Sequence, residues 1–388
     1  MDNIYFDNAA TSFPKAPGLG AAVAEFTDRR AVNVNRGAYK AAYRAEGCVY
    51  DTRKLIARFF DCCDKPERYA KRVIFTPGIT YSINYFLRGF LHEGDNIIIS
   101  SMEHHAVTRP LTELKKLGVD FKIAKADSDG VITADKFETL IDENTKAVLV
   151  THASNVCGTV LPIKQIGEMC RRHDIIFAVD TAQTAGSRYI SMRENHIDFL
   201  AFAGHKGLLG LQGIGGFIIS EKLDGKLTPL IYGGTGSLSH SYLLPEFLPD
   251  RFESGTLNLP AIYGLNHSIS YINNVGIDSI QQKETDLTDY FLKNISGFPS
   301  VRVIGKKDTV DRTSVISLDF TGHDNAETAY RLSDEYGIMC RVGLHCAPLA
   351  HETLGTLKSG TVRLSFGFFN TFDEIDRFFI ALRGILKS

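Results

Sequence analysis

The sequence of 388 residues is long enough for two domains that share a large core. Hydrophobic residues make up 44% and charged residues 23% of it, as is typical of a soluble globular protein. The net charge of −2 gives no electrostatic reason to bind nucleic acid or an anionic membrane. Residues 1–7 do not resemble a signal peptide, and no apolar run approaches the roughly 20 residues of a membrane span.

The seven cysteines are an odd number without regular spacing, at positions 48, 62, 63, 157, 170, 340 and 346. In a chain of this size, that pattern argues against a disulfide framework and favours reduced thiols. We therefore expect a cytoplasmic protein.

Short apolar runs alternate with amphipathic segments between about residues 70 and 220. The strand candidates are Arg72–Phe75, Asn96–Ser100, Ala147–Thr151, Ile175–Asp180, Asp198–Ala203 and Gly216–Ser220. Predicted helices between them include Thr80–Leu91, Thr133–Asp142 and Pro162–His173, where Pro162 suits a first helical turn. Repeated βα units of this length predict a mostly parallel sheet covered on both faces.

A long helical segment, Pro260–Val275, leads into a smaller C-terminal α/β block. Its predicted elements are Ser314–Phe320, Asp324–Tyr336, Ile338–Val342, Thr361–Phe366 and a closing helix at Phe372–Leu386. No linker rich in proline and glycine separates the two blocks. We expect a large domain over residues 15–260 and a small domain of residues 1–14 and 261–388, packed as one rigid body.

An acid and a lysine close two neighbouring predicted strands. Asp180 ends one apolar run, and Lys206 follows the next. Ligands of open α/β sheets sit at the carboxyl ends of strands. A lysine that forms a Schiff base and a carboxylate that keeps a pyridine nitrogen protonated suit pyridoxal 5′-phosphate (PLP). Taken singly, Asp180 is better explained as a helix cap and Lys206 as a surface residue.

Weaker signals accompany this pair. A turn at Thr76–Thr80 between a strand and a helix offers backbone N–H groups to a phosphate. His104 follows another strand and suits stacking on an aromatic cofactor and proton transfer. Metal binding by His104 and His105 is disfavoured, because adjacent side chains point apart and no HExxH or CxxC motif is present. No metal is expected.

Two further segments are ambiguous on local grounds. Asn155 follows the strand Ala147–Thr151 and can donate to a phenolate or a carboxylate, but on local evidence alone a turn-forming asparagine explains it better. The glycine-rich run 207–216 precedes a strand and has no GxGxxG spacing, so it does not predict a dinucleotide site.

In this order the motifs resemble the class V aminotransferase-like PLP enzymes, and within them the cysteine desulfurase and selenocysteine lyase family. The resemblance runs nearly end to end, through Tyr5–Thr11, Asn35-Arg36-Gly37, Glu103-His104-His105, Ser154-Asn155, Asp180 to Gln183, Gly204-His205-Lys206, Arg251–Thr256, Arg341–Ala347, Arg363-Leu364-Ser365 and Asn370-Thr371. It implies a PLP-dependent transferase fold of type I: a large domain with a mostly parallel sheet and a smaller C-terminal α/β domain that carries the catalytic cysteine loop.

The resemblance also implies roles for individual residues. Lys206 would be the Schiff-base lysine, Asp180 the pyridinium partner, and His104 the residue stacked on the ring. Asn155 and Gln183 would contact the cofactor's phenolic oxygen. Thr80 and His205 would hold its phosphate, and Thr256 would reach the phosphate in the neighbouring subunit of a homodimer. Arg363, with Asn155, would bind the substrate carboxylate through a planar donor fork suited to bidentate recognition. Cys346 falls at the position of the catalytic cysteine.

The sequence departs from the family pattern at three positions. Ala203 and Ile79 stand where hydroxyl residues that contact the phosphate are common, so the affinity for PLP is expected to be reduced. Leu344 stands where a second histidine is frequent, which leaves proton transfer around Cys346 unassigned. Arg341 is near Cys346 in sequence and would stabilise its thiolate, since positive charge favours the ionised form. It is also expected in the substrate site.

The function implied is desulfuration of L-cysteine to L-alanine, with the sulfur held as a persulfide on Cys346 and passed to an acceptor. The short segment between Cys346 and Arg363 is similar to the compact-loop, sulfur-assimilation subgroup, which uses a separate sulfur-acceptor protein. The alternatives are a selenocysteine lyase acting on L-selenocysteine, another class V reaction such as transamination or epimerisation, and a silent scaffold. The first needs no cysteine nucleophile, and the last needs neither Lys206 nor Asp180.

Overall fold

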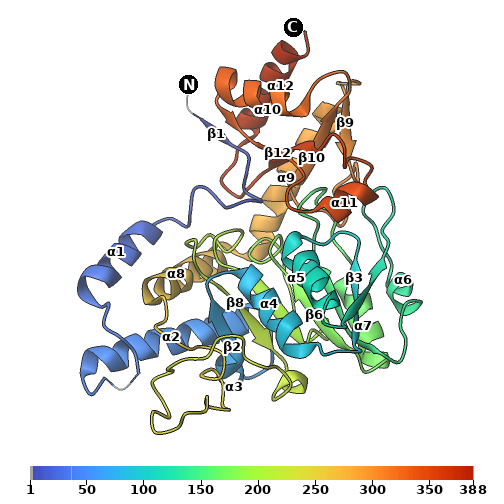
Figure 1. Ribbon diagram of the computed structural model, residues 1–388. Helices are drawn as coiled ribbons and strands as arrows, with labels where there is room; N and C mark the ends of the chain where they lie inside the picture. Colours follow the sequence, from blue (N-terminus) through green and yellow to red (C-terminus); the bar gives the residue numbers. More distant parts are fainter. Residues whose placement is uncertain (1–2, 36, 388) are drawn as a thin grey trace.

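The computed structural model describes residues 3–35 and 37–387, so Arg36 of the Asn35-Arg36-Gly37 motif lies outside the described residues. A seven-stranded sheet forms the centre of the larger part of the molecule (Figure 1). Its strands run in the order β2 (Val73–Thr76), β8 (Gly215–Ile219), β7 (Phe199–Ala203), β6 (Ile176–Asp180), β5 (Thr145–Thr151), β3 (Asn96–Ser100) and β4 (Asp120–Ala124). All neighbours from β7 to β4 pair in parallel, whereas β8 is antiparallel to both β7 and β2. The prediction of a mostly parallel sheet is confirmed.

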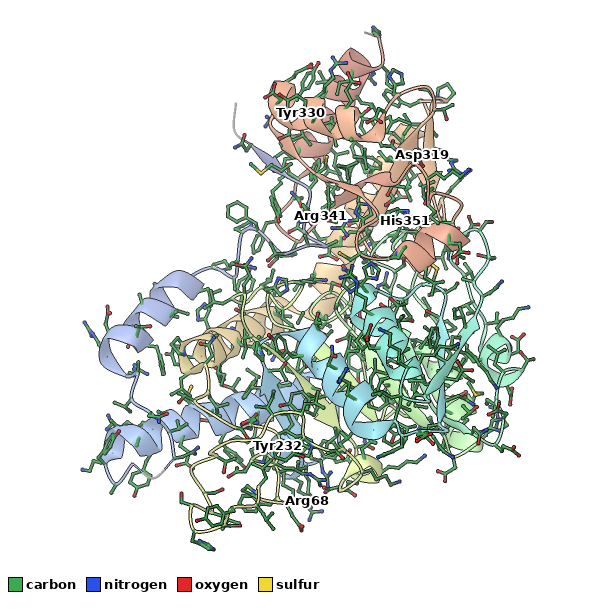
Figure 2. All side chains as sticks on the ribbon, viewed as in Figure 1. Arg68, Tyr232, Asp319, Tyr330, Arg341 and His351 are labelled. Atoms are coloured by element: carbon green, nitrogen blue, oxygen red, sulfur yellow. The ribbon has the colours of Figure 1, made fainter. Side chains whose placement is uncertain are left out.

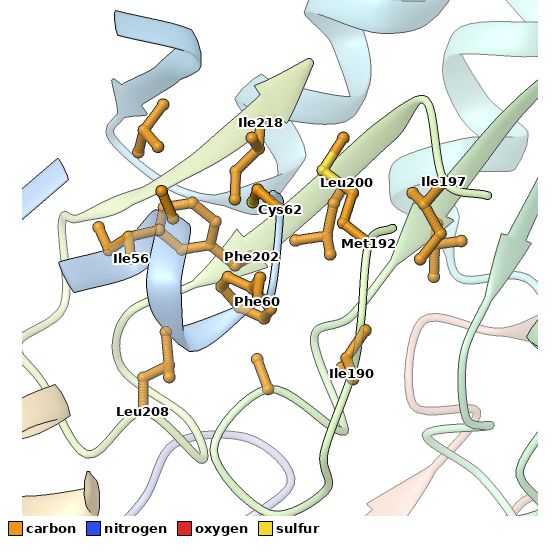
Figure 3. Close-up of a cluster of buried hydrophobic side chains, with 14 of the residues drawn as sticks. Ile56, Phe60, Cys62, Ile190, Met192, Ile197, Leu200, Phe202, Leu208 and Ile218 are labelled. Atoms are coloured by element: carbon orange, nitrogen blue, oxygen red, sulfur yellow. The ribbon is translucent and has the colours of Figure 1, made fainter. Parts of the chain in front are cut away.

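Alternation along the strands divides the apolar side chains between two cores. In β7, Phe199 and Ala201 face a core shared with α4 (Ile79–Phe90) and α5 (His105–Lys115). Leu200 and Phe202 face the opposite core, which is covered by the helices α1 (Leu19–Arg29), α2 (Lys40–Phe59), α7 (Ile163–Arg172) and α8 (Leu259–Val275). Figure 3 shows part of this second core around Phe60. Burial on both faces explains why the central strands are continuously apolar.

A second sheet carries the C-terminal lobe, by which we mean β1 and the elements from the second half of α9 onward. Its antiparallel strands run in the order β12 (Arg341–Gly343), β13 (Thr361–Ser365), β10 (Val315–Phe320) and β9 (Val301–Ile304). The remaining elements of this lobe are α9 (Ile277–Ile295), α10 (Asn325–Tyr336), α11 (Pro348–Thr353), α12 (Phe372–Ile385) and the pair β1 (Ile4–Tyr5) and β11 (Ile338–Met339). The N-terminal strand thus belongs to the C-terminal lobe (Figure 1).

Several elements differ from the predictions. The edge strand β4, the helices α5 and α9 and the strand β9 were not predicted, and α5 contains Pro110, which argues against a helix in the sequence. Pro162 precedes α7 as its N-cap and does not lie in its first turn. The predicted strand Ile338–Val342 is divided between β11 and β12, because one part pairs with β1 and the other with β13.

The lobes meet along α8 and α9 (Figure 1). The apolar face of α8 packs into the core of the large sheet, whereas Leu287 and Phe291 of α9 pack into the C-terminal lobe. The division into residues 15–260 and residues 1–14 with 261–388 stays a prediction. No helix within the described residues is long and apolar enough to cross a bilayer.

Candidate active site

The carboxyl ends of β3, β5, β6 and β7 lie at one edge of the large sheet, because these strands are parallel. His104, Asn155, Asp180 and Lys206 each stand at or shortly after one of these ends. Within the described residues, no three His, Cys, Asp or Glu side chains gather as they would around a metal ion.

Asp180 is the last residue of β6, and its carboxylate is buried. The backbone N–H of Ala182 donates to its Oδ1 at 2.8 Å. Burial raises the pKa of Asp180, while that hydrogen bond and the positive charge of Lys206 oppose the rise. The second carboxylate oxygen receives no hydrogen bond from the described residues, so it is available to a ligand.

Lys206 follows β7 and is half-buried as a residue, and its ammonium group makes no ion pair or hydrogen bond with the described residues. Burial lowers its pKa to about 8, and the negative charge of Asp180 opposes this shift. An amine with a lowered pKa is more often unprotonated near neutral pH and can then act as a nucleophile. The pair Asp180 and Lys206 therefore combines a buried acid with an activated amine.

His104 is the N-cap of α5, and its Nδ1 accepts a hydrogen bond of 3.0 Å from the backbone N–H of Ala106. Burial lowers the pKa of His104 to about 4, and the nearby charges of Lys206 and Arg363 lower it further. The ring is consequently neutral near pH 7. Because Nδ1 accepts, the proton of the neutral ring lies on Nε2.

Glu103 is a buried acid to which the sequence assigned no role. Its carboxyl group accepts from the backbone N–H of Thr151, at 2.9 and 3.0 Å, and from the hydroxyl of Ser100. It therefore joins the ends of β3 and β5. Burial raises its pKa to about 8, and the negative charge of Asp180 adds to this effect. Only its place beside His104 could have drawn attention to it.

The cysteine loop of the C-terminal lobe is held by three hydrogen bonds, two of which join it to this edge of the large sheet and one of which lies within the lobe. Asn155 Nδ2 donates to the carbonyl of His345 at 2.7 Å, and the backbone N–H of His105 donates to the carbonyl of Cys346 at 2.7 Å. His345 Nε2 lies 2.9 Å from the hydroxyl of Thr361. His345 and Cys346 have φ values of 49° and 56°, a left-handed conformation that costs energy in non-glycine residues. The surrounding contacts hold the loop in this shape.

Cys346 is the exposed member of the seven thiols, all of which are free. Cys62 packs beside Phe60 and Met192 (Figure 3), and its burial raises the thiol pKa well above the usual range. Burial also raises the pKa of Cys340 to about 12. Reactivity requires an accessible thiolate, which favours Cys346 over the buried cysteines.

Two arginines from neighbouring strands reach the same acid. Arg341 of β12 and Arg363 of β13 are direct cross-strand partners. Asp7 Oδ1 accepts from Arg363 Nη2 at 3.0 Å, and Asp7 Oδ2 accepts from Arg341 Nη2 at 2.9 Å. Figure 2 shows Arg341 where the C-terminal lobe meets the rest of the molecule. The same arginine pairs with Asp7, and its expected support of the Cys346 thiolate stays a prediction.

The buried Arg363 contacts both lobes. Its Nη1 donates to the backbone carbonyl of Asn155 at 3.1 Å, while its Nε is buried without a hydrogen-bond partner among the described residues. A buried donor left unpaired is unfavourable and suits a ligand that can accept from it. Arg363 therefore lies beside Asn155 and the cysteine loop.

The other predicted residues are placed around this centre. Gln183 Nε2 donates to the carbonyl of Ala9 at 3.1 Å. His205 Nδ1 lies 3.1 Å from the hydroxyl of Thr11. Thr80 is exposed in the first turn of α4, and Thr256 is exposed in the long loop before α8. No contact in the described chain links Thr80 or Thr256 to Lys206. Ala203 and Ile79 offer no side-chain donor, and Leu344 is exposed.

With this geometry in place, comparison with known proteins identifies the family. The family described as "Aminotransferase class-V" matches residues 4–378, so the chain belongs to the class V aminotransferases. Its relatives include a probable cysteine desulfurase of Methanothermobacter thermautotrophicus, 34% identical over 96% of this chain and 92% of the relative. Another, from Borreliella burgdorferi, is 32% identical over 99% of this chain and 92% of the relative.

Solved structures agree. The apo structure of cysteine desulfurase from Thermococcus onnurineus NA1 has a TM-score of 0.92 and 30% identity, covering 99% of this chain and 95% of that one. The cysteine desulfurase CsdA of Escherichia coli has a TM-score of 0.87 and 26% identity over the same shares. The resemblance derived from the sequence and the type I fold are confirmed.

Proposed function

We propose that this protein is a PLP-dependent cysteine desulfurase that takes the sulfur of L-cysteine onto Cys346 and releases L-alanine. The observation that carries the proposal is the hydrogen bond from the backbone N–H of His105 to the carbonyl of Cys346. It holds the residue with the exposed thiol at the edge of the sheet where Lys206 and Asp180 also lie. A transaminase or epimerase would have no use for a thiol placed there.

The residues at this edge fit PLP, the cofactor that the family generally uses. An unpaired amine on Lys206 and a buried carboxylate with an open oxygen on Asp180 are the groups that the cofactor's aldehyde and pyridine nitrogen require. When bound, the cofactor would supply an electron sink for charge developing at the substrate α-carbon. Asn155, Gln183, His104, Thr80 and His205 are the proposed further contacts.

The protein's own groups would then bind the substrate and move its protons. Arg363 would hold the α-carboxylate, since it is buried, charged and has an unpaired Nε. The amine of Lys206, once free, would take and return the α-proton, because its lowered pKa of about 8 suits a general base near neutral pH. His104 would serve as a proton donor through its Nε2–H group.

The sulfur step is a transfer between two thiols. The Cys346 thiolate attacks the sulfur of the substrate, an S–S bond forms, and the Cβ–S bond of the substrate breaks. The electron pair of that bond stays with carbon, which takes a proton, so the products are alanine and a Cys346 persulfide. The persulfide would pass to a separate acceptor, for which an exposed thiol is suited.

Two further parts of the proposal concern assembly and substrate. We propose a homodimer in which Thr256 completes the phosphate site of the partner subunit, since Thr256 is exposed within one chain. L-Selenocysteine is the alternative substrate of the same site.

The direct test is incubation of the purified, PLP-loaded protein with L-cysteine and a reductant, scored for sulfide and alanine in equal amounts. Cys346→Ala is the matched control, with Cys63→Ala as a second thiol variant outside the site. Formation of pyruvate or of D-cysteine, or no reaction, would contradict the proposal.

A further inference from the structure

Asp7 has no role in the proposed chemistry, although it pairs with two arginines beside the site. Main-chain hydrogen bonds fix its position: Phe6 N donates to Met339 O at 2.9 Å, and Ser365 N donates to Phe6 O at 2.7 Å. The N-terminal segment therefore lies between the chain leading into β12 and the end of β13. Asp7 forms an isolated bridge with Ser365, which places its side chain beside the arginines of both strands.

The two arginines would repel each other without this acid. Arg341 and Arg363 are directly opposed across β12 and β13, and like charges in that position are destabilising. Asp7 shares one carboxylate between them, with hydrogen bonds of 2.9 to 3.2 Å. The local charge of the three side chains is consequently +1, where the arginines alone would give +2.

The two guanidinium groups are used unequally. Asp7 faces Arg341 with both carboxylate oxygens, while Arg363 gives it only Nη2 and retains an unpaired Nε. A single α-carboxylate can thus be matched by Arg363. A second anionic group on the same substrate would meet an Arg341 that already pairs with Asp7.

We propose that Asp7 is a specificity-determining residue: by pairing with Arg341, it restricts the site to amino acids with one anionic group and disfavours those with an acidic side chain. The inference rests on the proposed function in one respect, namely that Arg363 receives the substrate carboxylate.

The test uses propionate and succinate, which differ by one carboxylate and cannot react as amino acids. Their affinities for the PLP-loaded protein are measured by calorimetry and, separately, as inhibition of L-cysteine turnover. In Asp7→Asn, the affinity for succinate relative to propionate should rise about tenfold, the effect of one charge-assisted hydrogen bond. Asp319→Asn is the matched control, because Asp319 also pairs with an arginine across neighbouring strands, away from the site (Figure 2).

A double variant tests whether the change in affinity for succinate depends on Arg341. In Asp7→Asn combined with Arg341→Gln, the gain for succinate should disappear. An unchanged ratio in Asp7→Asn, or a gain that persists without Arg341, would overturn the inference. The calorimetric arm needs no cysteine turnover. A protein that makes no sulfide but shows the Arg341-dependent gain would therefore refute the desulfurase and leave the role of Asp7 standing.

Discussion

The side-chain amide of Asn155 donates to the carbonyl of His345 at 2.7 Å, and this single bond ties the large sheet to the residue before Cys346. The backbone carbonyl of the same asparagine accepts from Arg363. Asn155 thus contacts both the cysteine loop and the proposed carboxylate-binding residue, through different atoms.

The first prediction follows from that bond. Asn155→Ala removes the donor to His345, whose left-handed backbone then has one restraint fewer. We expect sulfide formation to fall roughly tenfold or more and the stability to fall by about 1 kcal/mol, as for the loss of one hydrogen bond. Hydrogen exchange at residues 343–347 should accelerate. Asn266→Ala, which loses a side-chain bond to Thr52 outside the site, is the control. Unaltered exchange in Asn155→Ala would show that the bond does not hold the loop.

A second prediction concerns Asp180. In Asp180→Ala the pyridine nitrogen of the bound cofactor would lose its anionic partner, so turnover should drop by about a hundredfold or more, the scale of one preorganised electrostatic group. Near-ultraviolet circular dichroism and melting temperature show whether the fold survives. If the variant is folded, loaded with PLP and nearly fully active, Asp180 has no part in the mechanism.

Lys206 gives a prediction in pH. Its pKa of about 8 means that the amine is mainly protonated below pH 8 and mainly free above it. The rate at which PLP combines with the apoprotein should therefore rise through pH 7 and level off above about pH 8, whereas an ordinary lysine with a pKa of about 10.4 would give a rise up to pH 10. Because Asp180 raises this pKa, the midpoint should move to lower pH in Asp180→Ala. Lys206→Ala should show no combination by absorbance.

Features of the site could be predicted from the sequence where the residues that form them are close together in the chain. The strand that ends at Asp180 is fully buried, so its apolar run predicted the strand and its last residue marked the acid at the end of it. The roles of Asp7 and of the Asn155 amide toward His345 were not, because each partner lies more than 180 residues away in the sequence. The roles proposed for the site residues stay predictions.

The proposed dimer can be tested by complementation. Thr256 lies in the same loop as Glu253, whose Oε2 forms a buried ion pair of 2.5 Å with Arg53 Nη2. This ion pair anchors the loop, so Thr256→Ala should leave the loop in place. Mixed dimers of Lys206→Ala and Thr256→Ala subunits should contain one intact site if Thr256 serves the partner. They should then bind PLP with wild-type affinity at half the sites. If Thr256 acts within its own chain, no intact site forms. An active monomer in sedimentation would refute the shared site.

The last prediction separates the two substrates, and it depends on Cys346. Desulfuration needs a nucleophile to take the sulfur, whereas selenium leaves selenocysteine more easily and can do so without one. Cys346→Ala should therefore keep PLP and still bind L-cysteine, yet lose sulfide formation, while it retains a substantial part of any release of selenide. In the wild type, brief exposure to cysteine followed by alkylation and mass spectrometry should locate the extra sulfur on Cys346, the exposed thiol. Sulfur on Cys157 or Cys340, or full activity of Cys346→Ala with cysteine, would refute the transfer to Cys346. It would leave the PLP site at Lys206 unaffected, because that site does not involve the thiol.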